Sequence, residues 1–420
     1  MIPNMTWQEG QVKDYYNMLL GLNDGSMDVD AFIATEYGEA FRNMLNIRFA
    51  IERDEQAQDA WFDSLGLGVR RFETEDYFTR WLLLFPKDWE NGGRGEALPL
   101  VFYMHGGGIP IDEELSMTGF PETAAKEGFL LVYAQNTNWQ NTARILDYLA
   151  ANVPVDLERV YLSGFSQGGQ QVFSAFTHLP WKFAGASTTG TTIFLPHDCQ
   201  DFPYTETELN RLREYRVPLY QMCGKCEPFY YAPLNYFSPP VFNSEITKGL
   251  PNVQRPEVTY RGKAVGRDPT RIYRADAGIG NALYASAGKV QNGKMSSKYN
   301  PPPGLPREET ARWCVRKVNE RMELLGCAPR DEDTCLSFLN LPETDIHRIT
   351  GIYGDREKQF DYKGLLHSQI EIDDREDLPM YTFTVVDNFT HCIPITLGAW
   401  SWAMWKRFRR DRRSGVLQFE

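Results

Sequence analysis

The amino-acid sequence predicts an α/β protein in which helices cover both faces of a mostly parallel sheet. Two observations carry this prediction. Apolar runs of strand length alternate with helical stretches, and one such run leads through a G-x-S-x-G motif directly into a helix. Short apolar runs predict strands at 80–85, 98–104, 128–134, 160–165, 183–187, 217–222 and 381–386. Helices are expected at about 142–153, 167–177 and 395–410.

Two regions lie outside this alternation. Residues 1–75 show helical periodicity and are expected to form a partly helical N-terminal extension, with residues 76–420 as the main domain. The stretch from about 229 to 305 is rich in proline, glycine and aromatic residues, which is typical of a functional insertion. It follows the strand at 217–222, so we interpret it as a candidate lid or pocket wall.

The composition suits a large folded enzyme and excludes some partners. The 420 residues are 42% hydrophobic, and their net charge of -12 argues against a nucleic-acid partner. The N-terminus lacks the pattern of a signal peptide, and no run of about 18 apolar residues occurs, so we expect a cytoplasmic protein with no membrane partner. The basic cluster at 406–413 is interpreted as the solvated last turn of the closing helix.

The cysteines give no sign of a disulfide framework. There are 7 of them, an odd number without regular spacing, which predicts mostly reduced thiols. Cys223 and Cys226 form a C-x-x-C motif, but no second pair follows at the spacing of a zinc site. We interpret this motif as a structural loop.

The candidate nucleophile is Ser166, at the centre of the G-x-S-x-G motif. In such a motif the serine stands on a sharp turn between a strand and a helix. Gly164 and Gly168 are required because a Cβ at either position would collide with the neighbouring strand or helix. The amide of Gln167 then lies beside the serine, at a helix N-terminus that favours negative charge.

A second motif, His105-Gly106-Gly107-Gly108, follows the strand predicted at 98–104. Glycines allow the backbone to approach a substrate oxygen closely. We therefore expect the amides of Gly107 or Gly108 to complete an oxyanion hole with Gln167.

The serine needs a base and an acid that orients the base. Among the histidines after the motif, only His391 lies between a late strand and a terminal helix, whereas His347 and His367 are interpreted as surface histidines in loops. Glu227, in the loop after the strand at 217–222, is the preferred acid, and Asp387 is its rival because it lies four residues before His391.

These motifs resemble the α/β-hydrolase serine esterases of the polyhydroxybutyrate depolymerase and feruloyl esterase type. The stretch 155–169 is similar to the nucleophile region of that group, and 224–228 matches its G-x-x-D-P acid loop with glutamate in place of aspartate. His391 is followed by Pro394 and a final helix that contains Trp400, Trp402 and Trp405, as in that group. The resemblance covers roughly residues 78–228 and 305–410.

The resemblance implies a hydrolase that cleaves a small carboxylic ester through an acyl-enzyme intermediate, with a triad of Ser166, His391 and Glu227. It implies no cofactor and no metal. The aromatic residues at 229–237 are compatible with an aromatic or apolar acyl group, and equally with packing of the insertion. Two alternatives stay open: a serine peptidase of the same fold, and a catalytically inactive binding protein. The oligomeric state is not predicted.

Overall fold

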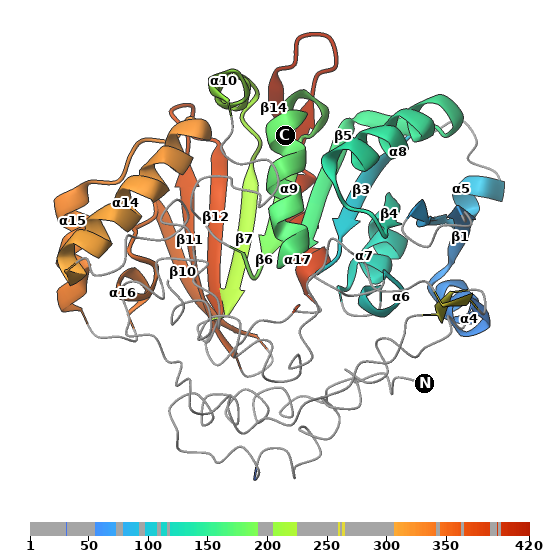
Figure 1. Cartoon of the computed structure of the whole chain (residues 1–420), viewed down its shortest axis with the longest axis horizontal. Helices are drawn as coiled ribbons and strands as arrows, with labels where there is room; N and C mark the ends of the chain where they lie inside the picture. Colours follow the sequence, from blue (N-terminus) through green and yellow to red (C-terminus); the bar gives the residue numbers. More distant parts are fainter. Residues whose placement is uncertain are drawn as a thin grey trace.

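A computed structural model shows a twisted ten-stranded sheet between two layers of helices (Figure 1). It describes residues 55–72, 79–91, 97–106, 111–115, 118–191, 205–224, 259–260, 263–264, 306–341, 345–362, 365–386 and 396–420, together with residues 31 and 393. The proposed insertion lies outside the described residues, apart from the short strands β8 (Thr259–Tyr260) and β9 (Lys263–Ala264).

The sheet has the strand order β1-β2-β4-β3-β5-β6-β7-β12-β11-β10. Its centre, from β4 to β12, is parallel, and the strands at both ends are antiparallel to their neighbours. This confirms the predicted α/β class with a largely parallel sheet. The strands are β1 (Leu67–Phe72), β2 (Trp81–Pro86), β3 (Leu98–Met104), β4 (Leu130–Ala134), β5 (Val155–Phe165), β6 (Gly185–Thr189), β7 (Leu219–Gly224), β10 (Arg356–Tyr362), β11 (Leu365–Asp373) and β12 (Pro379–Val386).

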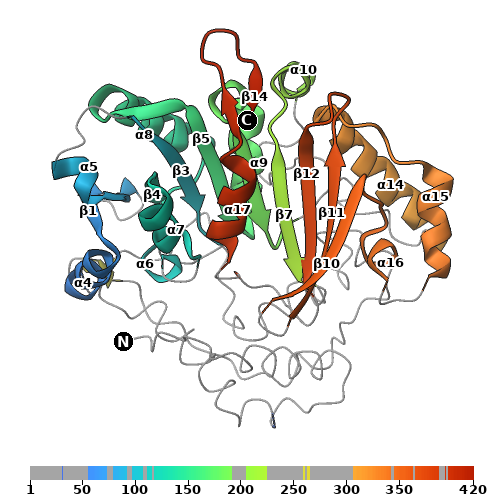
Figure 2. The ribbon, with the colours of Figure 1, turned by 180° about the vertical axis from the view of Figure 1, so that it is seen from behind.

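Helices cover both faces because the central strands are apolar on both sides. Along β3, Leu100 and Phe102 pack into one hydrophobic cluster while Val101 and Tyr103 pack into the other, as the alternation of side chains in a strand requires. One face carries α8, α9 and α14 (Figure 1), and the opposite face carries α7 and α17 (Figure 2). The helices are α4 (Glu55–Leu65), α5 (Lys87–Asn91), α6 (Ile111–Glu114), α7 (Phe120–Glu127), α8 (Trp139–Asn152), α9 (Gln167–His178), α10 (Glu206–Tyr215), α14 (Arg307–Leu324), α15 (Glu332–Ser337), α16 (Ile346–Thr350) and α17 (Leu397–Trp405).

Residues 55–72 form helix α4 and the sheet strand β1. Strand β1 pairs with β2 along its whole length, and Phe62 and Leu67 are buried in the cluster under α7. The part of the predicted N-terminal extension that precedes residue 55 lies outside the described residues, apart from residue 31.

The end of the chain corrects the prediction for residues 395–410. Helix α17 ends at Trp405, and Phe408–Arg410 forms a strand, β13, that pairs with β14 (Leu417–Phe419). Arg410 is only 1% exposed, and its guanidinium donates to the carbonyl oxygens of Phe183, Gly415 and Arg216 at 2.7, 2.8 and 2.9 Å. The basic cluster is therefore not the solvated turn of a helix, because one of its arginines ties the C-terminal hairpin to the body of the domain.

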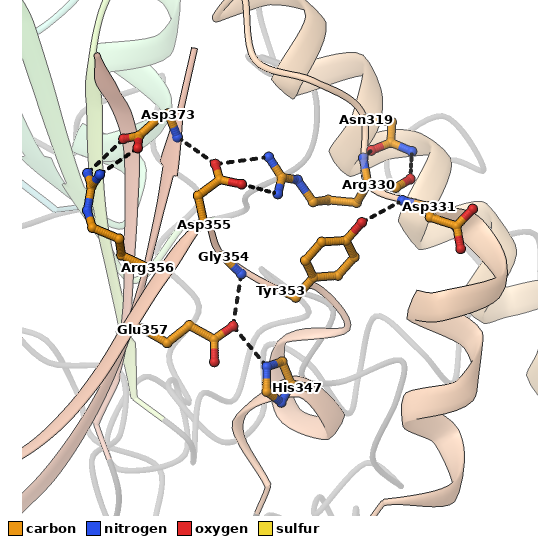
Figure 3. A network of polar contacts seen from close by, with 10 residues as sticks. All are labelled: Asn319, Arg330, Asp331, His347, Tyr353, Gly354, Asp355, Arg356, Glu357 and Asp373. Atoms are coloured by element: carbon orange, nitrogen blue, oxygen red, sulfur yellow. Dashed lines mark hydrogen bonds and ion pairs between the residues drawn. The ribbon is translucent and has the colours of Figure 1, made fainter. Parts of the chain in front are cut away.

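Strands β10 and β11, together with α14 to α16, were not predicted. A polar network joins these helices to the hairpin formed by β10 and β11 (Figure 3). Arg330, which follows α14, donates to Asp355 at 3.0 Å, and Asp355 accepts the amide of Asp373 at 2.8 Å. Burial alone would raise the pKa of Asp355, but these hydrogen bonds lower it below its usual value. The network holds the helical segment against the outer strands.

Four buried cysteines in the described part of the chain are free thiols: Cys223, Cys314, Cys327 and Cys335. Burial raises the pKa of Cys327 and of Cys335 to about 12, so both stay protonated near neutral pH. Cys226, the second half of the C-x-x-C motif, lies outside the described residues. No helix among the described residues is long and apolar enough to cross a membrane.

Candidate active site

Ser166 lies at the junction between β5 and α9, where the chain turns sharply. Its backbone has φ 52° and ψ -114°, a conformation that residues with a Cβ rarely adopt. The Ser166 amide donates to the carbonyl oxygen of Thr189 at 2.9 Å, and the Ser166 carbonyl accepts from Gln170 at 3.2 Å. The turn is thus fixed on one side to β6 and on the other to the first turn of α9. Strain of this kind is characteristic of functional sites.

The two glycines of the motif have the packing role that the sequence predicted. A Cβ on Gly164 would lie 2.5 Å from the carbonyl carbon of Gly168, and a Cβ on Gly168 would lie 2.5 Å from the carbonyl carbon of Met104. Both neighbours are backbone atoms of regular elements, which cannot rotate away. The turn around Ser166 therefore tolerates no side chain at either position.

The same contact brings the two glycine motifs together. Gly164 pairs with Met104 across β5 and β3, and the Cβ position of Gly168 is 2.7 Å from the carbonyl oxygen of His105. The entrance to the His105 loop therefore packs against the first turn of α9. Gln167 is the first residue of that helix, where amides have no acceptor within the helix. Gly107 and Gly108 lie outside the described residues, so their role stays a prediction.

The predicted base and acids also lie outside the described residues: His391, Glu227 and Asp387. The strands that lead to them are described. β7 ends at Gly224 and β12 at Val386, and these two residues are partners in a parallel pair. Because β5, β6, β7 and β12 are consecutive and parallel, the chain leaves β7 and β12 at the edge of the sheet where Ser166 stands.

The last helix is connected through β6 to β5, the strand that leads to Ser166. Ser401 on α17 donates to Ser187 on β6 at 2.9 Å, and Ser187 donates to Ser163 on β5 at 2.9 Å. The amide of Gly398 donates to the carbonyl oxygen of Thr118 at 3.0 Å, at the start of α7. The helix after His391 therefore has a defined position relative to the serine.

Two other histidines lie in regular elements and not in loops, contrary to the sequence prediction. His367 is 3% exposed on β11, opposite Val386, where it stacks on Phe360 and meets the edge of Trp400. His347 is on α16, with its Nε2 2.9 Å from Glu357. In 365–373 only Ile370 and Ile372 alternate with charged residues, which is a short signal for the strand that buries His367.

Within the described part of the chain, no group of three or more His, Cys, Asp or Glu side chains is arranged to hold a metal ion.

Comparisons with known proteins match parts of the chain. No protein-family model matches it. A bifunctional acetylxylan esterase/xylanase from Neocallimastix patriciarum is 30% identical over 111 residues, which cover 23% of this chain and 16% of that protein. This chain thus spans much less than two thirds of that relative.

Solved structures also match parts of the chain. S-formylglutathione hydrolase from Staphylococcus aureus shares 13% identity over 39% of this chain and 79% of its own, at a TM-score of 0.33. The enzyme of the same name from Agrobacterium tumefaciens shares 13% identity over 44% of this chain and 82% of its own, at a TM-score of 0.31. The strand order and the strand-serine-helix turn described above give this chain the α/β-hydrolase fold.

Proposed function

We propose that this protein is a serine hydrolase that cleaves carboxylic esters through an acyl-enzyme intermediate. The observation that carries the proposal is the strained backbone of Ser166, at φ 52°, between β5 and α9 and against the entrance to a glycine loop. A serine with no chemical role has no need of this conformation, which costs about 1–3 kcal/mol. The partial match to an acetylxylan esterase/xylanase supports an ester as the substrate.

The proposed mechanism assigns one role to each predicted residue. His391 removes the proton from the Ser166 hydroxyl as its oxygen attacks the ester carbonyl, and it then protonates the departing alcohol. Glu227 orients the imidazole, while the amides of Gln167 and of Gly107 or Gly108 stabilise the oxyanion. In the second half of the reaction, His391 removes a proton from the water that attacks the acyl-enzyme and returns it to the Ser166 oxygen as the carboxylic acid leaves. The neighbouring ends of β7 and β12 support this assignment, because acid and base would then follow adjacent strands.

The first test concerns the nucleophile and the base. Ser166→Ala and His391→Ala should each lower hydrolysis of p-nitrophenyl esters by several orders of magnitude, and the double variant should be scarcely slower, because the two residues act as a unit. Ser174→Ala, which changes a buried serine of α9, is the matched control and should keep wild-type turnover. Near-normal turnover of Ser166→Ala would refute the proposal.

The same assays separate the alternatives. An inactive binding protein would not react with a fluorophosphonate, whereas a peptidase would react and would prefer aminoacyl anilides to esters. The acid is tested by Glu227→Gln, which should abolish most activity, against Asp387→Asn, which should have a mild effect. The reverse order would assign the acid to Asp387.

A further inference from the structure

Two buried side chains hold the chain on either side of the glycine loop that follows β3. Glu114 on α6 is 0% exposed, and its Oε1 accepts the amide of Gly106 at 2.7 Å. Gln135, directly after β4, is 2% exposed, and its Oε1 accepts the amide of Ile111 at 3.2 Å. Gly106 is the residue before the proposed oxyanion donors, and Ile111 begins the helix after them. Each end of the loop therefore has its own acceptor.

His105 connects these two contacts. Its ring is 1% exposed, with Nδ1 2.8 Å from the carbonyl oxygen of Gly106 and Nε2 2.8 Å from that of Gln135. At the loop entrance, the N–H of Gly106 therefore bonds to Glu114, and the carbonyl oxygen of Gly106 lies within hydrogen-bond distance of the His105 ring. On its other side, the His105 carbonyl packs against Gly168 in the first turn of α9.

This arrangement matters because oxyanion donors act only when they are in place before the reaction. Stabilisation of the developing charge depends on the donors being held in position without reorganisation. The side chains of Glu114 and Gln135 accept backbone amides on either side of the loop, and both side chains are buried.

We propose that Glu114 and Gln135 are positioning residues that set the oxyanion loop relative to Ser166. This proposal rests on the function proposed above. The two side chains act through the amides of Gly106 and Ile111 and do not touch the substrate.

The effect should fall on the transition state. A misplacement of about 1 Å in a catalytic group can cost about 10²-fold in rate. We therefore expect Glu114→Ala to lower kcat by about 10- to 100-fold with KM nearly unchanged. Binding of a trifluoromethyl ketone, which forms a tetrahedral adduct with the serine, should weaken by the same factor.

The control is Asp374, another buried carboxylate that accepts backbone amides; it lies at the opposite edge of the sheet and its Oδ2 also pairs with Arg216 at 2.8 Å. Its Oδ1 accepts the amides of Glu376 and Leu378 at 2.8 and 3.0 Å, in the turn before β12. Both Asp374→Ala and Glu114→Ala should lower stability, but Asp374→Ala should leave kcat unchanged. Glu114→Gln retains an acceptor for Gly106 and should return kcat to within a few-fold of wild type.

Three results would overturn the proposal: equal kcat values for Glu114→Ala and Asp374→Ala, an effect confined to KM, or a Glu114→Gln variant as slow as Glu114→Ala. If Glu114→Ala does not fold, Gln135→Leu removes the second acceptor and should lower kcat in the same way. An unchanged kcat would then refute the idea.

Failure of the proposed function gives a different result, since the wild-type protein itself would not hydrolyse esters. Hydrogen exchange still tests the contact in that case. The Gly106 amide, resolved with overlapping peptides, should exchange faster in Glu114→Ala than in Asp374→Ala, and Glu114→Gln should restore its protection. An unaltered Gly106 rate would show that Glu114 does not hold the loop.

Discussion

The backbone of Ser166 allows a prediction that is independent of any substrate. Its φ of 52° and ψ of -114° are the mirror image of an extended conformation, which glycine adopts as readily as its normal counterpart. Alanine at this position keeps the Cβ and its strain, whereas glycine removes both. Ser166→Gly should therefore be more stable than Ser166→Ala, although both lack the hydroxyl.

The size of the difference follows from two opposing terms. Relief of the strain contributes about 1–3 kcal/mol. The larger conformational entropy of glycine in the unfolded chain offsets about 0.5–1 kcal/mol of this. Ser166→Gly should thus exceed Ser166→Ala by roughly 1 kcal/mol in free energy of unfolding.

The assay is urea unfolding of both variants, with the midpoint and slope fitted for each. Ser174 provides the control on α9, inside a regular helix, where glycine should be less stable than alanine by about 1 kcal/mol. The reasoning is wrong if alanine at 166 is as stable as glycine while the pair at 174 behaves as expected.

Two further predictions concern packing. Gly168→Ala places a Cβ 2.5 Å from a backbone carbon of Met104. It should lower the free energy of unfolding by about 2–3 kcal/mol and slow ester hydrolysis at least about tenfold. The control is Gly68→Ala, which meets the Phe85 ring in the outer strand pair and should lower stability without slowing turnover. A folded Gly168→Ala enzyme with normal kcat/KM would contradict the contact between the two motifs. Arg410→Ala leaves three carbonyl oxygens without their donor and should lower the free energy of unfolding by about 3 kcal/mol. Substitution of the exposed Arg412 by alanine should leave the free energy of unfolding nearly unchanged. Equal urea midpoints for the two variants would exclude this role for Arg410.

The central elements could be predicted because their signals are local. Strand β3 is a continuous apolar run, and the turn at Ser166 is set by Gly164 and Gly168, which the sequence shows directly. Boundaries depended on finer chemistry. Helix α8 begins at Trp139, three residues earlier than predicted, because the Asn138 side chain caps it by accepting the Asn141 amide.

The missed features depend on partners that are distant in the chain. The burial of Arg410 requires carbonyl groups from Phe183 and Arg216, which no local pattern reveals. Strand β10 is almost entirely exposed and owes its conformation to pairing with β11, so its sequence lacks an apolar run. His367 was misjudged for the same reason, because the strand that buries it was not recognised.

The exposed strand β10 also determines how the sheet behaves towards other chains. An open sheet has a last strand whose free N–H and C=O groups can pair with a strand from another molecule. Four of the seven residues of β10 are charged, and Arg356 and Lys358 are held by Glu371 and Asp373 on β11. A second strand added here would have to bury these charges. We therefore expect these charges to oppose strand addition along β10, and we expect an apolar substitution there to lower solubility without changing the site around Ser166.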